Sequence, residues 1–151
     1  MRKYKTIDPE GRSGLGFAAQ AGAFAGEKDY VGQHMSCDAA AFRQLFGNAG
    51  EPKAVLFRAR ATDVFTKKIE FVFKQRDGGN WGVDLPLTTE WRTIRVPVKD
   101  LRPYWNTKRD GTTKPAPQTA LGVALGYGRW LYQDSLDKPH GFEISSVKLE
   151  F

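Results

Sequence analysis

The chain has 151 residues, 40% of them hydrophobic and 13% aromatic, with a formal net charge of +6 and a single cysteine. That length fits one ordinary domain, and the composition argues against a disordered chain and excludes an internal disulfide and a cysteine-rich zinc site. The longest apolar runs reach about half of the roughly 20 residues that a membrane span requires, and the N-terminus lacks the apolar core of a signal peptide. We therefore expect one domain over residues 1–151, without a membrane-spanning segment.

Short runs in which apolar and polar residues alternate follow one another along the chain, separated by glycine, proline and polar clusters. A period of two marks a strand with one buried face. Strands are predicted, in chain order, at 15–19, 30–37, 53–61, 68–76, 80–85, 93–98, 119–127 and 141–151. About eight short antiparallel strands at this spacing favour an all-β sandwich over a helical or α/β fold.

One short helical turn interrupts the predicted strands. Asp38 can cap the segment 39–46, in which three apolar residues fall at helical spacing, and Gly47 ends it. We expect this turn to cover one end of the sandwich.

The alternation also predicts which side chains face the core. Val55, Phe57 and Ala59 would point inward, so that Arg58 and Arg60 point outward together. In the strand that follows, the predicted inward residues are Ile69, Phe71 and Phe73. Trp81 has the phase of the inward residues of its own strand and is therefore also expected in the core.

The strand at 119–127 is unusual because one of its faces carries only small residues. That face consists of Ala120, Gly122, Ala124 and Gly126. Small residues let another segment of the chain, or a ligand, approach the backbone closely. The sequence leaves both possibilities open: a face covered by the chain itself, or the floor of a binding groove.

Two connections carry aromatic residues that the strand pattern does not place in the core. Tyr104 and Trp105 lie in the segment 102–118, and Trp130 and Tyr132 lie in the connection before the last strand. A segment as long as 102–118 is more often functional than idle. Its local charge is +3, four basic residues minus one acidic residue, from Arg102, Lys108, Arg109, Lys114 and Asp110. Whether Trp105 and Trp130 meet a ligand or fold back onto the sandwich stays open.

From residue 50 to residue 151, the order of segments resembles the galactose-binding-like jelly rolls, in particular the carbohydrate-binding modules of polysaccharide-degrading enzymes. Three features carry the resemblance: a tryptophan that opens a strand, an apolar step with proline, and an acidic residue before leucine. Here these are Trp91, Val96-Pro97-Val98 and Asp100-Leu101. The resemblance implies a jelly-roll β-sandwich in which Trp91 is structural and packs at the rim of the core. It also implies an accessory domain excised from a larger multidomain enzyme, extracellular or associated with the cell envelope.

The last strand departs from this family. Its members often carry acidic or amide residues there that help to hold a structural calcium, whereas this chain has Ile144-Ser145-Ser146-Val147. Calcium prefers carboxylate and carbonyl oxygens, which serine replaces poorly. Glu27, Glu143 and Glu150 could still contribute, but we predict no metal and no other cofactor.

No catalytic constellation can be assembled from the sequence. The two imidazoles are His34 and His140, Cys37 falls on the opposite face of the strand from His34, and no serine occupies a nucleophile elbow. There is no glycine-rich phosphate loop and no metal-ligand spacing. We therefore predict that the chain is not an enzyme.

The sequence favours a non-catalytic carbohydrate-binding module that targets an attached glycoside hydrolase or polysaccharide lyase. Sugars present C–H groups that suit aromatic planes and hydroxyls that suit polar side chains. The net charge favours a polysaccharide with sulfate or uronate groups, to which arginine can make two parallel hydrogen bonds. The predicted ligand-binding residues are Tyr104, Trp105, Trp130, Tyr132, Arg58, Arg60 and Arg102.

Two other classes of protein share some of these features. A ligand-free structural β-sandwich that braces a catalytic domain would have the same fold without a binding site, and it is the main alternative. A nucleic-acid binder would also combine basic and aromatic residues. It is disfavoured, because the arginines are spread over several strands and no RNA-binding or DNA-binding motif is present.

Overall fold

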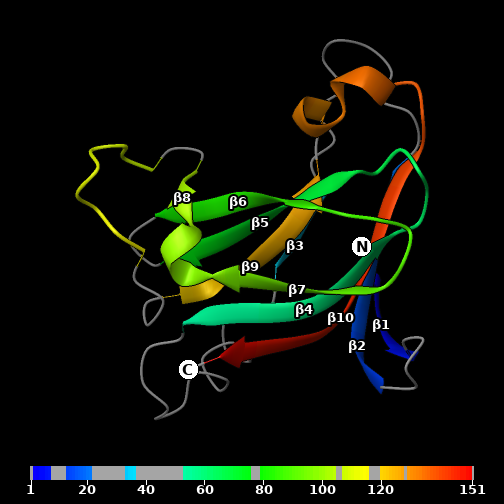
Figure 1. Cartoon of the computed structure of the whole chain (residues 1–151), viewed down its shortest axis with the longest axis horizontal. Helices are drawn as coiled ribbons and strands as arrows, with labels where there is room; N and C mark the ends of the chain where they lie inside the picture. Colours follow the sequence, from blue (N-terminus) through cyan, green and yellow to red (C-terminus); the bar gives the residue numbers. More distant parts are fainter. Residues whose placement is uncertain are drawn as a thin grey trace.

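The computed structural model describes residues 2–7, 13–21, 33–36, 53–75, 79–104, 107–115, 120–127 and 129–150; for 2–7, 13–21, 33–36, 120–123, 127, 129 and 146–149 only the backbone is described. In this part of the chain two five-stranded sheets face each other (Figure 1). All strand pairings in the two sheets are antiparallel. The predicted all-β sandwich is thus confirmed, whereas the predicted helical turn at 39–46 lies outside the described residues.

Each sheet is assembled from strands that are distant in the sequence. The first sheet has the order β1 (Arg2–Ile7), β2 (Ser13–Ala21), β10 (His140–Glu150), β4 (Ala54–Ala61) and β7 (Arg92–Pro97). The second sheet has the order β3 (Gln33–Ser36), β9 (Ala120–Tyr127), β5 (Lys68–Gln75), β6 (Asn80–Pro86) and β8 (Arg102–Pro103). Three short 3-10 helices accompany them: η1 (Val98–Asp100), η3 (Arg129–Leu131) and η4 (Gln133–Ser135).

The edge strands β7 and β8 lie on the same side of the sandwich. Each is the last strand of its sheet, and η1 together with the buried Leu101 joins one to the other. This side therefore combines two exposed sheet edges with the loop at 107–115, which extends outward at the left of Figure 1.

The eight predicted strands are all present, and β1 and β8 are two strands that the sequence did not predict. β1 reads RKYKTI, which contains too few apolar residues to show alternation. β8 has two residues, one of them proline, and lies inside the segment that was expected to be a loop. Both are edge strands, where the hydrophobic pattern is weakest because only one neighbour is paired.

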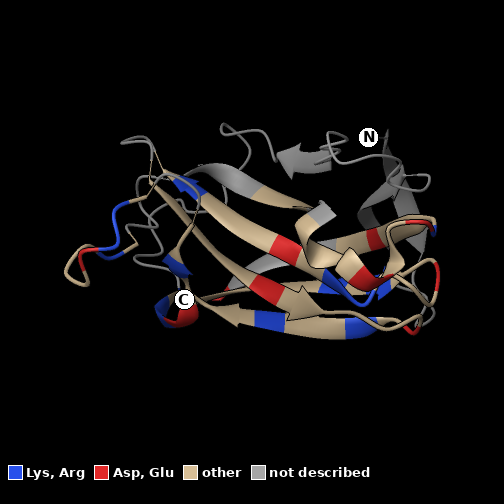
Figure 2. Cartoon of the chain, turned by 90° about the horizontal axis from the view of Figure 1, so that it is seen from above, with Lys and Arg blue, Asp and Glu red and all other residues tan. Residues whose placement is uncertain are grey.

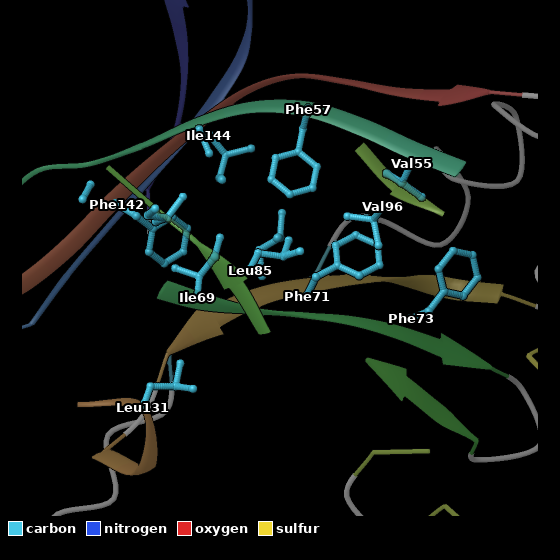
Figure 3. Close-up of a cluster of buried hydrophobic side chains, with 14 of the residues drawn as sticks. Val55, Phe57, Ile69, Phe71, Phe73, Leu85, Val96, Leu131, Phe142 and Ile144 are labelled. Carbon is cyan, nitrogen blue, oxygen red and sulfur yellow. The ribbon is translucent and has the colours of Figure 1, made fainter. Parts of the chain in front are cut away.

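Aromatic rings from both sheets fill the core (Figure 3). Phe57 of β4 and Phe71 of β5 are nearly parallel, with ring centroids 6.0 Å apart and an interplanar angle of 8°. Phe73 lies beside Phe71, with centroids 6.5 Å apart. The residues predicted to point inward from β4 and β5 are all buried, so the sequence assigned the faces of both strands correctly.

The two tryptophans of the 80–101 region have different environments. Trp81 is buried in the core, as predicted. Trp91 is only half-buried, and the guanidinium carbon of Arg60 lies 5.1 Å from the centroid of its ring. Trp91 thus contacts a cation on the outer side of the first sheet instead of packing at the rim of the core.

Candidate functional site

The outer face of the second sheet carries two carboxylates on neighbouring strands. Glu70 of β5 and Asp84 of β6 are direct partners in the register, so their side chains leave the sheet on the same side. The Tyr104 hydroxyl lies 2.7 Å from Glu70 Oε1 and 2.7 Å from Asp84 Oδ1. The indole N–H of Trp130 also donates to Glu70 Oε1. We call Glu70, Asp84, Tyr104 and Trp130 the Glu70 cluster.

Glu70 points away from the core because its neighbours Ile69 and Phe71 point into it. Its side chain is nevertheless buried, with 1% of its surface exposed. Burial of a carboxylate is costly unless hydrogen bonds compensate, and here donors from two separate loops supply them. The buried carboxylate therefore fixes the orientation of both aromatic rings.

Tyr104 reaches the cluster because the sheet leaves room for its ring. Its backbone N–H donates to the Asn80 carbonyl at 2.7 Å, which extends the pairing of β8 with β6. The ring lies over Gly82, where a Cβ atom would be 2.9 Å from Tyr104 Cγ and 2.8 Å from the Phe71 carbonyl oxygen. Only glycine fits at this position without displacing one of these groups.

The Tyr104 phenol stays protonated at unusually high pH. Burial raises the pKa of Tyr104 well above its usual value, and the hydrogen bonds to Asp84 and Glu70 raise it further. A phenolate at this position would face two carboxylates, so the neutral form is strongly preferred. Tyr104 is therefore a hydrogen-bond donor throughout the neutral and alkaline range in which the fold persists.

We expect this raised pKa to appear as a late step in an alkaline titration. The unfolded phenol ionises near pH ~10, so the contribution of Tyr104 to stability is complete below that pH and is lost as pH rises towards the folded-state pKa. Phenolate absorbance should show a step that appears only with unfolding, and Tyr104→Phe should reduce the amplitude of that step by one tyrosine. A titration of Tyr104→Phe identical to that of the wild type would contradict the assignment.

The small-residue strand lies next to the Glu70 cluster. In the register of β9 with β5, Gly126 is opposite Glu70, and Ala124 is opposite Val72. Ala124 and Val72 are each 1% exposed, and Gly126 is buried as well, although all of them lie on the face away from the core. Of the two possibilities that the sequence left open, coverage by the chain itself therefore holds at this part of β9.

Tyr132, a predicted ligand-binding residue, lies inside the molecule. It is 3% exposed, its ring stacks on His140 at a centroid distance of 3.9 Å, and its hydroxyl donates to the Lys68 carbonyl at 2.5 Å. His140 is also buried, and its Nε2 lies 2.9 Å from the Ser135 carbonyl oxygen. This position supports a structural role for Tyr132, and it removes His140 from the surface.

Arg58 and Arg60 lie on the outer face of the first sheet, across the sandwich from the Glu70 cluster. Their outward direction agrees with the sequence pattern, but Arg58 is buried and Arg60 Nε donates to Glu143 Oε2 at 2.5 Å. The structure therefore does not bring these two arginines together with Tyr104 and Trp130. Trp105 lies outside the described residues.

A pocket of about 800 Å³ opens on the side of the sandwich where β7 and β8 form the sheet edges. The β7–β8 pocket, as we call it, contains Arg102, the remaining predicted arginine, together with three prolines, Pro97, Pro103 and Pro115. Its basic lining residues are Lys53, Arg95, Lys99, Arg102 and Lys114. None of the described residues that line it is acidic.

Hydrogen bonds hold several parts of this pocket in place. Arg95 Nε donates to Glu150 Oε2 at 2.9 Å, and Arg102 Nη1 lies 3.3 Å and 3.2 Å from the carbonyl oxygens of Lys99 and Leu101. The loop at its mouth is ordered by Asp110, whose carboxylate accepts hydrogen bonds from the backbone N–H groups of residues 112 and 113 and from a threonine hydroxyl. These bonds hold the pKa of Asp110 well below its usual value.

Figure 2 marks the charged positions along the chain. Acidic and basic positions both occur on the strands, whereas the loop at the left of the view carries basic positions on either side of an acidic one. Within the described residues, no carboxylate lies within ion-pair distance of Lys99, Arg102 or Lys114. The acidic Glu70 cluster and the basic β7–β8 pocket are thus two surfaces of opposite charge.

Among the described residues, no group of three or more histidine, cysteine, aspartate or glutamate side chains is placed to hold a metal ion. Nor does this part of the chain contain a helix of the length and apolar character needed to cross a bilayer.

The sequence did not single out Glu70 or Asp84 as site residues. Because Ile69 and Phe71 were predicted to point inward, the sequence implied only that Glu70 points outward. One signal was present: a charged residue in the middle of a strand, in a chain that has a second strand with a face of small residues. Glu70 lies opposite Gly126 of this small-residue strand on one side and opposite Asp84 of β6 on the other.

Comparisons with known proteins agree with this fold. No protein-family model matches the sequence, and no curated protein matches it. A family 11 carbohydrate-binding module from Clostridium thermocellum, solved in complex with a β-1,3-1,4-mixed-linked tetrasaccharide, is structurally similar: the TM-score is 0.62 at 16% identity, covering 99% of this chain and 81% of that one. The family 11 module of a cellulosomal cellulase from the same organism has a TM-score of 0.53 at 14% identity, covering 99% and 94%. The chain has the jelly-roll fold of these carbohydrate-binding modules.

Proposed function

We propose that the chain is a non-catalytic module that binds a polysaccharide where Asp84, Tyr104 and Trp130 reach solvent on the outer face of its second sheet. One observation carries the proposal: the Glu70 carboxylate accepts hydrogen bonds from both Tyr104 and Trp130. Two aromatic residues from separate loops, each expected from the sequence to meet a sugar, are thereby held on one face. The fold shared with family 11 carbohydrate-binding modules supports the same function.

The chemistry of the Glu70 cluster suits a sugar. Tyr104 and Trp130 are each partly exposed, although Trp130 also packs against the core, so the exposed parts of their rings can offer an apolar surface to the C–H groups of a pyranose. Asp84 is exposed beside them and lies 3.5 Å from Lys68 Nζ, which provides an acceptor and a donor for sugar hydroxyls. Because the rings are already fixed by hydrogen bonds to Glu70, little conformational freedom remains to be lost on binding.

Two finer parts of the proposal concern the ligand and the parent protein. The net charge of +6 supports a preference for a polysaccharide with sulfate or uronate groups. The role of the module would be to hold an attached glycoside hydrolase or polysaccharide lyase near its substrate, outside the cell or in the cell envelope. The alternative is a structural sandwich that braces a catalytic domain and binds no glycan.

Replacing Trp130 with alanine should weaken polysaccharide binding by about 1 to 3 kcal/mol, because a partly buried aromatic anchor is lost. Native affinity electrophoresis in gels that contain neutral or anionic polysaccharides measures this loss. Trp91→Ala is the matched control, since Trp91 is also half-buried but lies against Arg60 on the first sheet.

The outcomes separate the two candidate functions. Retardation of the wild type and of Trp91→Ala, with loss of retardation in Trp130→Ala, supports binding at the Glu70 cluster. If no polysaccharide retards the wild type, the structural alternative is favoured. Equal effects of both tryptophan substitutions would mean that the glycan lies elsewhere. Circular dichroism of each variant checks that the fold is intact.

A further inference from the structure

The β7–β8 pocket has a chemistry that the Glu70 cluster lacks. Five basic residues line it, and among them only Arg95 is paired with a carboxylate in the described part of the chain, that of Glu150. We propose that this pocket is a subsite for the sulfate or carboxylate substituents of a glycan whose sugar rings rest on the Glu70 cluster. The inference rests on the proposed function, and it assigns the preference for anionic glycans to the β7–β8 pocket.

Arg102 connects the two surfaces. It is the partner of Gly82 in the pairing of β8 with β6, and Tyr104 follows two residues later with its ring over the same glycine. Residues i and i+2 of an extended chain lie on one face, about 7 Å apart. A glycan of more than one sugar unit can therefore contact Tyr104 and Arg102 at the same time.

The size of the pocket suits a whole sugar unit with its anionic substituent better than a lone ion. Its volume of about 800 Å³ falls within the range of small-molecule sites, roughly 300–1,000 Å³. Prolines of β7, β8 and the loop give it apolar walls, and the cations lie around them. A ring can therefore rest on the apolar walls while its anionic group meets arginine and lysine.

Several of these cations are already positioned for binding. Arg102 is tied to the carbonyl oxygens of Lys99 and Leu101 through one nitrogen, so its remaining N–H groups have a restricted direction. A guanidinium can bind a sulfate or carboxylate with two parallel hydrogen bonds. Lys114 is presented by the loop that Asp110 orders.

The neighbouring acidic surface favours a glycan over a nucleic acid. A nucleic acid that used the pocket cations for its phosphates and Tyr104 for base stacking would place further phosphates near Glu70 and Asp84. Phosphates placed there would be repelled by the two carboxylates, whereas sugar hydroxyls donate hydrogen bonds to a carboxylate. A glycan with charged groups at intervals can place hydroxyls at the Glu70 cluster and an anionic group in the β7–β8 pocket.

The test compares mixed-linkage β-glucan with the same glucan after chemical sulfation, by affinity electrophoresis of the whole chain. The double variant Lys99→Gln with Lys114→Gln removes two exposed pocket charges that make no ion pair within the described residues. Lys67→Gln with Arg92→Gln is the control, because it removes two exposed charges outside the pocket. Arg102→Lys keeps the charge and removes the forked geometry.

We expect the pocket double variant to bind the sulfated glucan about tenfold more weakly, the sum of two exposed charge contacts, and to bind the neutral glucan as the wild type does. The control should change either affinity less than twofold. Arg102→Lys should weaken binding of the sulfated glucan and leave binding of the neutral glucan unchanged. Added salt should reduce the preference for the sulfated form, because salt screens contacts between exposed charges. The Debye length is about 8 Å at physiological ionic strength and becomes shorter as salt is added.

Two results would overturn the inference while leaving the proposed function intact. One is an equal loss in the pocket and control variants, which would show that only net charge matters. The other is a single-stranded oligonucleotide that binds more tightly than the sulfated glucan and loses affinity in the pocket variant. Failure of the proposed function itself looks different: the wild type is then retarded by neither glucan.

Discussion

Replacing Phe71 with alanine is expected to lower the free energy of unfolding by about 3–5 kcal/mol, the range seen when a large buried aromatic residue is truncated. Phe71 is completely buried, its ring is nearly parallel to that of Phe57 across the two sheets, and Phe73 packs beside it. The substitution thus removes the contact between the sheets at the centre of the core. Urea denaturation followed by tryptophan fluorescence measures the change.

Val64→Ala is the matched control for this substitution. Val64 is 68% exposed, so its truncation should change the free energy of unfolding by no more than about 0.5 kcal/mol. A domain of this size has only about 5–15 kcal/mol of stability in total, so Phe71→Ala should unfold a substantial part of the protein at modest temperature. Similar losses for the two variants would show that the Phe57–Phe71 contact does not hold the sheets together.

Replacing Gly82 with alanine should destabilise the protein by about 1–3 kcal/mol, the usual cost of overpacking. The new methyl group would lie 2.8 Å from the Phe71 carbonyl oxygen and 2.9 Å from Tyr104 Cγ. Because the Tyr104 ring can move more easily than the strand backbone, the ring should be displaced from its position over residue 82. Tyr104 should then lose its hydrogen bonds to Glu70 and Asp84. Binding of polysaccharide should weaken together with stability.

A double-mutant cycle with Tyr104→Ala separates the two contacts of the new methyl group. Without the tyrosine ring, Gly82→Ala should cost less, because only the contact with the Phe71 carbonyl remains. A cost that is unchanged in this background would assign the whole effect to the backbone. A Gly82→Ala variant as stable as the wild type would contradict the close contact between the Tyr104 ring and Gly82.

The inward faces of β4 and β5 could be predicted because apolar and polar residues alternate along both strands. Phe57 and Phe71 follow directly from it, and so does the outward direction of Arg58 and Arg60. Which surface an outward residue reaches depends on the order of strands in two sheets, and local sequence does not contain that order. For this reason Arg58 and Arg60 were grouped with aromatic residues that lie on the opposite side of the sandwich.

The Glu70 cluster could be predicted only in part for the same reason. Tyr104 and Trp130 were selected as loop aromatics, but their common partner is a strand residue 34 and 60 positions away. Tyr132 satisfied the same criterion as Trp130 and is nevertheless buried against His140. Tyr132 is thus part of the core, whereas Trp130 packs against the core and stays partly exposed, a difference that only the packing of the sandwich decides.

The composition of the β7–β8 edge also bears on how the molecule avoids self-association. Edge strands present unpaired N–H and C=O groups on which a strand from another copy can add, and proteins oppose this with charges and prolines. Here β7 contains Arg95 and ends at Pro97, Lys99 follows, and β8 consists of Arg102 and Pro103. A second copy approaching this side would bring cation against cation, and Pro97 and Pro103 have no N–H with which to continue a ladder. Residues suited to an anionic ligand therefore also keep the two open sheet edges from growing into a fibre.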